Sequence, residues 1–164
     1  MAKRKDPDPV IAEQARVSLL ADVRLRLARL RAKAATRLAK VTAKPQPKGA
    51  TRLKFEMHDV CDTFSVQLHA ENDSPGGRHI TSVFSETAIP GCTDVDWDSY
   101  WTVGVDPWAV VREAIIGLVA DAWADAGGAG YPLPAVISYH DDCREFDLVR
   151  RRWVTDHMGQ PLAE

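Results

Sequence analysis

The sequence has few cysteines and no long hydrophobic run, and each shortage excludes a class of protein. Three cysteines, an odd number, do not complete a disulfide framework. The most apolar stretch, residues 114–123, contains Asp121 and is far too short to span a bilayer. The N-terminal residues MAKRKDPDPVIAE are cationic but lack the apolar segment of a secretory signal. We therefore expect a protein of the reducing cytoplasm, with no membrane association.

Glycine and proline are also scarce. Ten residues of each are too few for a fibrous or low-complexity chain. The glycines form neither a phosphate-cradling loop nor a dinucleotide-binding fingerprint, and no serine stands in a nucleophile elbow. The chain has 164 residues, of which 45% are hydrophobic, and this is enough for one domain with a modest core. We expect a single small domain without a cofactor.

Charge is unevenly distributed, although the formal net charge is only −2. Residues 1–54 carry 15 lysines and arginines against four acidic residues, a balance of +11. Residues 55–164 carry the other six basic and 19 acidic residues, a balance of −13. This asymmetry separates a basic N-terminal arm from an acidic body.

The first predicted element is a long amphipathic helix over residues 9–44. Asp8 is a capping residue, and Pro9 suits the first helical position. Apolar residues then recur at steps of three and four, the spacing of one helix face. They are Leu20, Val23, Leu27, Leu30, Ala34, Leu38 and Val41. Residues 1–8 are predicted to be a disordered basic terminus, and residues 45–50 a linker.

Residues 51–156 are predicted to form the α+β domain. Apolar and polar residues alternate in three segments, as in strands of an antiparallel sheet with one wet face. These segments are residues 51–60, 62–71 and 78–86. The aromatic and acidic stretch 87–105 is expected to be an ordered surface loop with at most one short strand.

The second helix is predicted to start at Asp106-Pro107 and to end before Gly127-Gly128. It is apolar on nearly every side, so it should be buried across one face of the sheet. Two more strands are expected at 133–141 and 144–155, before a flexible C-terminus at 157–164. The prediction is an α+β fold of order α-β-β-β-α-β-β, with a mainly antiparallel sheet of about five strands.

A His-Asp-x-Cys tetrad occurs twice. The residues that could bind zinc are His58 and Cys61 in the first tetrad, and His140 and Cys143 in the second. Structural zinc half-sites usually carry Cys-x-x-Cys or a glycine, and both are missing here. Because Asp also suits a hairpin turn, we interpret the tetrads as two turns and expect no metal.

An enzymatic hypothesis uses the same region. Cys143 and His140 would be a nucleophile and its base, or Asp141 and Asp142 a pair of carboxylates. A reactive cysteine needs a cation or helix N-terminus that lowers its pKa, and no flanking motif indicates one. We therefore expect a non-enzymatic protein.

Protein binding is the function that the sequence favours. Aromatic residues stand among acidic residues between positions 94 and 101, a composition typical of an interface for a basic partner. The candidate residues are Trp97, Tyr100, Trp101, Asp94, Asp96 and Asp98. The alternative is that the tryptophans anchor the loop itself. In the order of its elements the chain resembles small bacterial accessory proteins such as secretion chaperones and toxin-immunity partners, and this resemblance also implies protein binding.

Nucleic-acid binding is the alternative function. A basic amphipathic helix can neutralise phosphates, and the candidate residues on its cationic face are Arg26, Arg29, Lys33 and Lys40. The other interpretation of this face is that it is solvated or faces the acidic body. The acidic body would also compete with phosphate for these cations.

Overall fold

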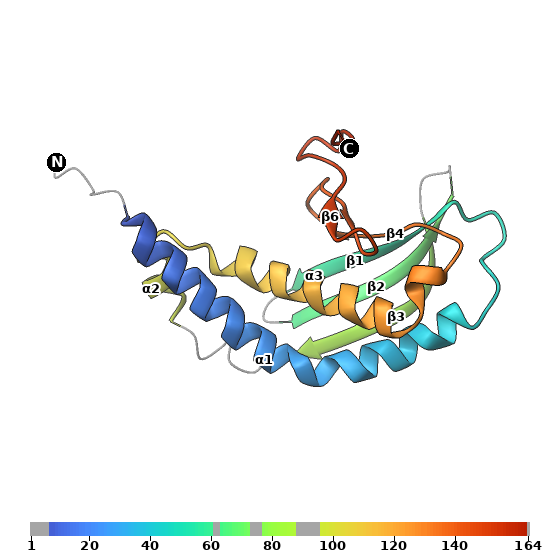
Figure 1. Ribbon diagram of the computed structural model, residues 1–164, viewed down its shortest axis with the longest axis horizontal. Coiled ribbons are helices and arrows are strands. Elements are labelled where there is room, and N and C mark those ends of the chain that lie inside the picture. The colour runs from blue at the N-terminus through green and yellow to red at the C-terminus, as the bar shows by residue number, and fades with distance from the viewer. Residues whose placement is uncertain (1–6, 61–62, 73–76, 88–95, 164) are drawn as a thin grey trace.

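The computed structural model describes residues 7–60, 63–72, 77–87 and 96–163. Within them, a six-stranded sheet is covered on one face by two long helices, α1 (Pro9–Thr42) and α3 (Pro107–Asp125) (Figure 1). The predicted α+β class is confirmed. None of the helices in this part of the chain has both the length and the hydropathy needed to cross a membrane.

Helix α1 begins as its sequence predicts. The Asp8 side chain accepts a hydrogen bond from the backbone N–H of Val10 at 2.9 Å, and Pro9 takes the first helical position. Its buried residues include every member of the predicted apolar face, together with Leu19. Val10, Ile11 and Val17 near its N-terminal end stay exposed.

The first three strands form an antiparallel meander, as predicted. They are β1 (Arg52–Val60), β2 (Thr63–Glu71) and β3 (Arg78–Thr87). The strand order is β3-β2-β1-β4-β5-β6, and β4 (Ala135–Tyr139) runs parallel to β1. Parallel neighbours need a long crossover connection, which here contains α3 and the short 3-10 helix η1 (Gly128–Gly130). The sheet is therefore mixed, and β3 is one of its two edge strands.

Two segments differ from their predictions. Residues 144–155 form a small hairpin of β5 (Phe146–Asp147) and β6 (Arg152–Trp153) rather than one strand. The Asp147 carboxylate accepts from the N–H groups of Val149 and Arg150, and this interaction favours the turn. Between Asp96 and Val105, the expected loop or strand is instead a short helix, α2 (Trp97–Thr102), capped by Asp96. Residues 88–95 of the same predicted loop lie outside the described residues.

The core lies between the sheet and the two long helices. Phe55 of β1 and Trp123 of α3 are almost fully buried, and their ring centroids lie 5.5 Å apart at an edge-on angle. An ion pair also joins the helices, because Arg31 of α1 lies 2.6 Å from the Asp125 carboxylate of α3. The other face of the sheet is polar, as the alternating pattern predicts.

Candidate functional site

A groove of about 830 Å³ runs between the C-terminal half of α1 and the edge strand β3. The two elements lie side by side along the lower edge of the molecule in Figure 1. Basic side chains stand on both walls of the groove, which we call the basic groove. They are Lys33, Arg37, Lys40 and Lys44 from α1 and the residues after it, and Arg78 and His79 from β3.

No carboxylate lines the basic groove within the described residues. In this part of the chain, Lys40, Lys44 and Arg78 also form no ion pair. Hydroxyl groups of β3 and apolar side chains complete the lining; they are Thr81, Ser82, Ser85, Val41, Ile80, Pro45, Pro47 and Tyr131. The basic groove therefore combines positive charge with hydroxyl donors and a partly apolar surface.

Several other arginines of α1 are paired with carboxylates. Arg16 lies 2.9 Å from Glu113 of α3, Arg26 lies 2.9 Å from Asp22, and Arg24 lies 3.8 Å from Glu113. Arg16 and Arg24 thus contact the acidic body, whereas the partner of Arg26 lies in α1 itself. The positive charge that can serve an external anion is thus concentrated towards the C-terminal end of α1.

The four residues of the nucleic-acid hypothesis divide between these two regions. Lys33 and Lys40 line the basic groove, whereas Arg26 and Arg29 do not. Arg78 and His79, which supply the opposite wall, are not among the residues predicted from the sequence. Arg78 is the first residue of β3, and the sequence contains no signal that places this strand beside α1.

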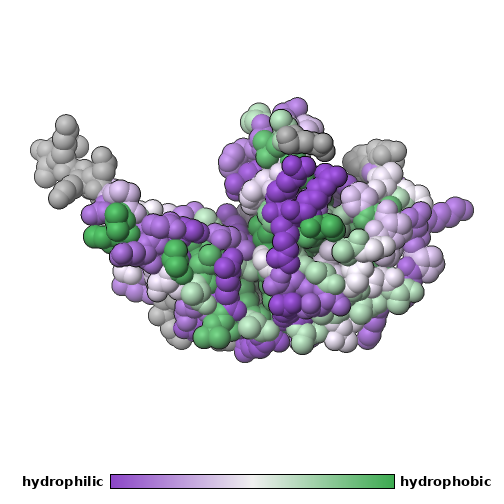
Figure 2. All heavy atoms as spheres, in the orientation of Figure 1, coloured by the Kyte–Doolittle hydropathy of each residue, from purple (hydrophilic) through white to green (hydrophobic). Residues whose placement is uncertain are grey.

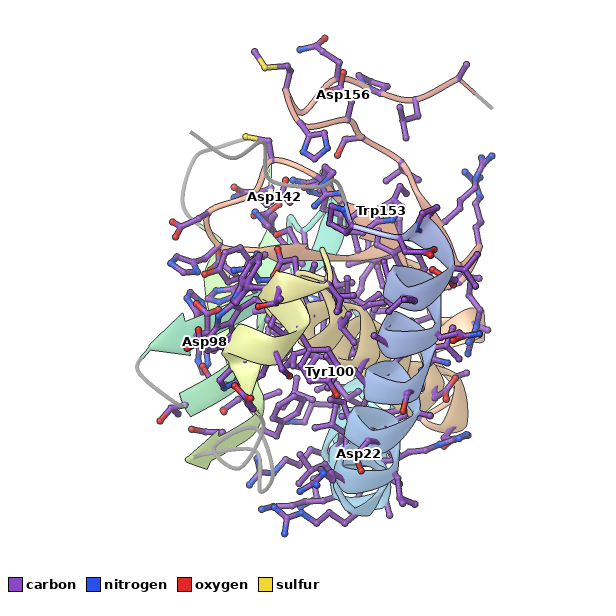
Figure 3. All side chains as sticks on the ribbon, turned by 90° about the vertical axis from the view of Figure 1, so that its left-hand side faces the viewer. Asp22, Asp98, Tyr100, Asp142, Trp153 and Asp156 are labelled. Carbon is purple, nitrogen blue, oxygen red and sulfur yellow. The ribbon has the colours of Figure 1, made fainter. Side chains whose placement is uncertain are left out.

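The aromatic and acidic candidates gather on α2. Trp97 stacks on Trp108 of α3 with centroids 5.2 Å apart and planes 4° apart, and Trp108 in turn contacts Phe64 of β2. Trp101 is 50% exposed. Tyr100 lies on the side of α2 that faces α1, whereas Asp98 lies on the opposite side (Figure 3). Asp96 and Asp98 are exposed, and Asp94 lies outside the described residues.

The histidines of the two tetrads meet at the ends of the parallel strands β1 and β4. The rings of His58 and His140 stack with centroids 5.0 Å apart. His140 and Asp141 form the predicted turn, whereas His58 still belongs to β1 and Cys61 lies outside the described residues. Cys143 is an exposed free thiol. Among the described residues, no group of three or more His, Cys, Asp or Glu is arranged to hold a metal.

The carboxylates of the enzymatic hypothesis have local partners. Asp142 accepts two hydrogen bonds from the Arg144 guanidinium, at 2.8 and 2.7 Å. Burial disfavours the charged form of Asp142, but these bonds outweigh it and lower its pKa. Asp141 is exposed and lies 3.2 Å from the His140 ring. This arrangement explains Asp142 as an ion-pair partner of Arg144 rather than one of two coupled carboxylates.

Comparisons of this chain with protein-family models, with curated proteins and with solved structures find no match.

Proposed function

We propose that this protein is a non-catalytic, cytoplasmic accessory protein of bacterial type that binds a short acidic segment of a partner protein in the basic groove. The observation that carries the proposal is the basic lining of both groove walls, with no carboxylate among the described lining residues. Complementary charge of this kind steers an acidic partner to its site and fixes its register.

The dimensions of the basic groove suit an extended peptide. From Lys33 to Lys44 the wall spans about 16 Å, at a rise of roughly 1.5 Å per helical residue. An extended chain advances roughly 3.3 Å per residue, so about five residues fit along this wall. The hydroxyl groups of Thr81, Ser82 and Ser85 would meet backbone or carboxylate groups of such a peptide.

Three features favour an acidic peptide over nucleic acid. Apart from the imidazole of His79, Tyr131 is the one aromatic ring that lines the basic groove in the described chain, whereas single-stranded nucleic acid binds to several stacking platforms. Prolines 45 and 47 and two aliphatic side chains make much of the surface apolar. A polyanion long enough to extend beyond the groove would also meet the acidic body, whose formal charge is −13. A short acidic segment avoids that repulsion.

The test compares two anions on the full-length protein. A fluorescein-labelled decapeptide of alternating glutamate and threonine and a labelled oligothymidine of ten nucleotides are titrated at about 50 and about 200 mM salt. We expect saturable binding of the peptide, and weaker binding of the oligonucleotide at both salt concentrations. Tighter binding of the oligonucleotide would transfer the function to nucleic acid.

Charge reversal then locates the site. Lys40→Glu combined with Arg78→Glu should weaken peptide binding by about tenfold or more, because one cation is lost from each wall. Arg26→Glu combined with Arg29→Glu is the matched control, since it changes the net charge by the same amount at residues of the same helix that do not line the basic groove. Equal losses in the two proteins would show that the helix attracts the peptide non-specifically and that the groove is not the site.

A further inference from the structure

The sheet is wider than the helix layer that covers it. Beyond α3, a second cavity of about 500 Å³ lies beside the end of β4 and the strands β5 and β6. It is separate from the basic groove and shares none of its lining residues. In Figure 2 hydrophobic atoms lie between hydrophilic side chains in this region, below the C-terminal segment. We call this cavity the arginine pocket.

The floor of the arginine pocket is apolar. Met57, Ile116, Ala120 and Phe146 line it, and Trp153 of β6 stands at the rim with 37% of its surface exposed. Gly117 of α3 faces the same space, and a Cβ atom added there would have no neighbour within 4 Å. The helix wall is therefore recessed where a larger side chain would fill the pocket.

Four arginines surround this floor, against two acidic residues. They are Arg24, Arg112, Arg144 and Arg151, with Glu113 and Asp142. The Arg144 guanidinium is bound by Asp142 and lies 4.7 Å from the centre of the Trp153 ring. Asp142 and Trp153 lie close together under the C-terminal segment in Figure 3. An arginine held between a carboxylate and an indole presents a fixed cation and an aromatic wall.

Arg112 is held on the opposite wall. Its guanidinium lies 3.8 Å from the centre of the Tyr139 ring, and it donates to Asp59 at the long distance of 3.5 Å. The Tyr139 hydroxyl donates to the same carboxylate. The Nε atom of Arg112 is enclosed and has no hydrogen-bond partner within the described residues. A buried donor without a partner is unfavourable, so this wall carries a strained polar contact.

We propose that the arginine pocket binds a small organic anion with a flat apolar body, namely an aromatic carboxylate. Each of the four arginines is held near a carboxylate: Arg24 near Glu113, Arg112 near Asp59, Arg144 near Asp142 and Arg151 near Asp121. A guanidinium carries five N–H donors, so these fixed arginines keep further donors for the carboxylate of a ligand. The apolar floor and the two aromatic walls suit a ring better than a hydrated inorganic ion. The volume lies within the range of pockets that hold small molecules, roughly 300–1,000 Å³.

The experiment uses full-length ¹⁵N-labelled protein and follows the indole N–H resonance of Trp153, assigned with Trp153→Phe. The probes are 2-naphthoate, its neutral analogue 2-naphthalenemethanol, and inorganic phosphate. We expect a saturable shift with 2-naphthoate, and about tenfold or weaker affinity for the other two probes. No saturation by about 10 mM 2-naphthoate, or equal affinity for the alcohol or for phosphate, would overturn the proposal.

Two matched pairs of variants locate the binding. Gly117→Leu places a side chain in the pocket, and it should abolish binding of 2-naphthoate while the protein stays folded; Ala124→Leu changes an exposed position of the same helix and should leave binding intact. Arg151→Gln should weaken binding, whereas Arg150→Gln should not, because only Arg151 lines the pocket. Undiminished binding in Gly117→Leu would place the ligand elsewhere and contradict the proposal.

Discussion

The Nη1 atom of Arg37 in α1 donates to the carbonyl oxygen of Val83 in β3 at 3.0 Å, and to that of Ser82 at 3.3 Å. An edge strand presents unpaired backbone groups, which can recruit another strand. Here the Arg37 guanidinium, which comes from a helix, donates hydrogen bonds to two carbonyl groups of the edge strand β3. The bond also fixes the distance between the two walls of the basic groove, so it connects the fold to the proposed site.

Replacing Arg37 should therefore affect both stability and association. We expect Arg37→Ala to lower the free energy of unfolding by about 1–2 kcal/mol, since a charged donor to backbone carbonyls is lost. The freed edge should also increase concentration-dependent self-association, measured by sedimentation. Lys40→Ala is the control, because Lys40 is an exposed residue of the same helix. Equal stability and equal association of the two variants would mean that the hydrogen bonds to β3 are unimportant.

Alanine substitutions of the two tryptophans of α2 should show which ring stabilises the fold and which is available to a partner. Trp97→Ala removes the stack on Trp108, so the free energy of unfolding should fall by about 1–3 kcal/mol. Trp101→Ala removes an exposed ring, and it should change stability by less than about 0.5 kcal/mol. Urea unfolding of both variants provides the measurement. If Trp101→Ala alone weakens capture of a partner from the host, the acidic aromatic surface is an interface in its own right.

The fold was predictable where one local signal decided each element. The Asp-Pro pairs at Asp8 and Asp106 marked both long helices, and strict alternation marked β1 and β2. The parallel pairing of β1 with β4 was not predictable, because it depends on how α3 carries the chain across the sheet. The helix α2 was also missed: Trp97, Tyr100 and Trp101 do have helical spacing after the cap Asp96, but a helix of six residues is too short for such a period to stand out.

The candidate sites were less predictable than the fold. Lys33 and Lys40 were visible as cations on one helix face, but their partners across the basic groove, Arg78 and His79, come from a strand distant in sequence. The arginine pocket depends on the sheet extending beyond α3, which no local pattern encodes. The spacing of apolar residues indicates which face of a single helix or strand is buried. A groove depends on how two such elements pack against each other, and that spacing does not encode it.

Two glycines near each other in sequence should respond in opposite directions to alanine. Gly117 lies within α3, and an added Cβ meets nothing within 4 Å, so Gly117→Ala should stabilise the protein by about 0.5–1 kcal/mol. At Gly128, an added Cβ would lie 2.2 Å from ring atoms of Trp123, so Gly128→Ala should destabilise it by roughly 1–3 kcal/mol or more. Chemical unfolding at one pH measures both changes. A stabilising Gly128→Ala would show that the Trp123 ring can move away freely.

His69 on the polar face of the sheet should make stability depend on pH. Burial lowers the pKa of His69, and the nearby His79 and His58 lower it further. The carboxylates of Glu56 and Glu71 raise the pKa, but they do not cancel the effect of burial. The Nε2 atom of His69 is enclosed, has no hydrogen-bond partner among the described residues, and lies 3.9 Å from the Glu56 carboxylate. Because the folded protein binds this proton less tightly than the unfolded chain does, stability is greatest above the ordinary histidine pKa of 6.5.

The stability that neutral His69 provides should then be lost as the pH falls from about 6.5 through the lowered pKa. We expect the free energy of unfolding of the unmodified protein to decrease between about pH 7.5 and pH 5, and to decrease less in His69→Gln. Glutamine keeps a polar side chain at this position but does not titrate, so the two proteins differ in one proton. Urea unfolding at intervals across this range gives the two profiles. Parallel profiles would show that protonation of His69 is tolerated in the folded state, with Glu56 offsetting its burial.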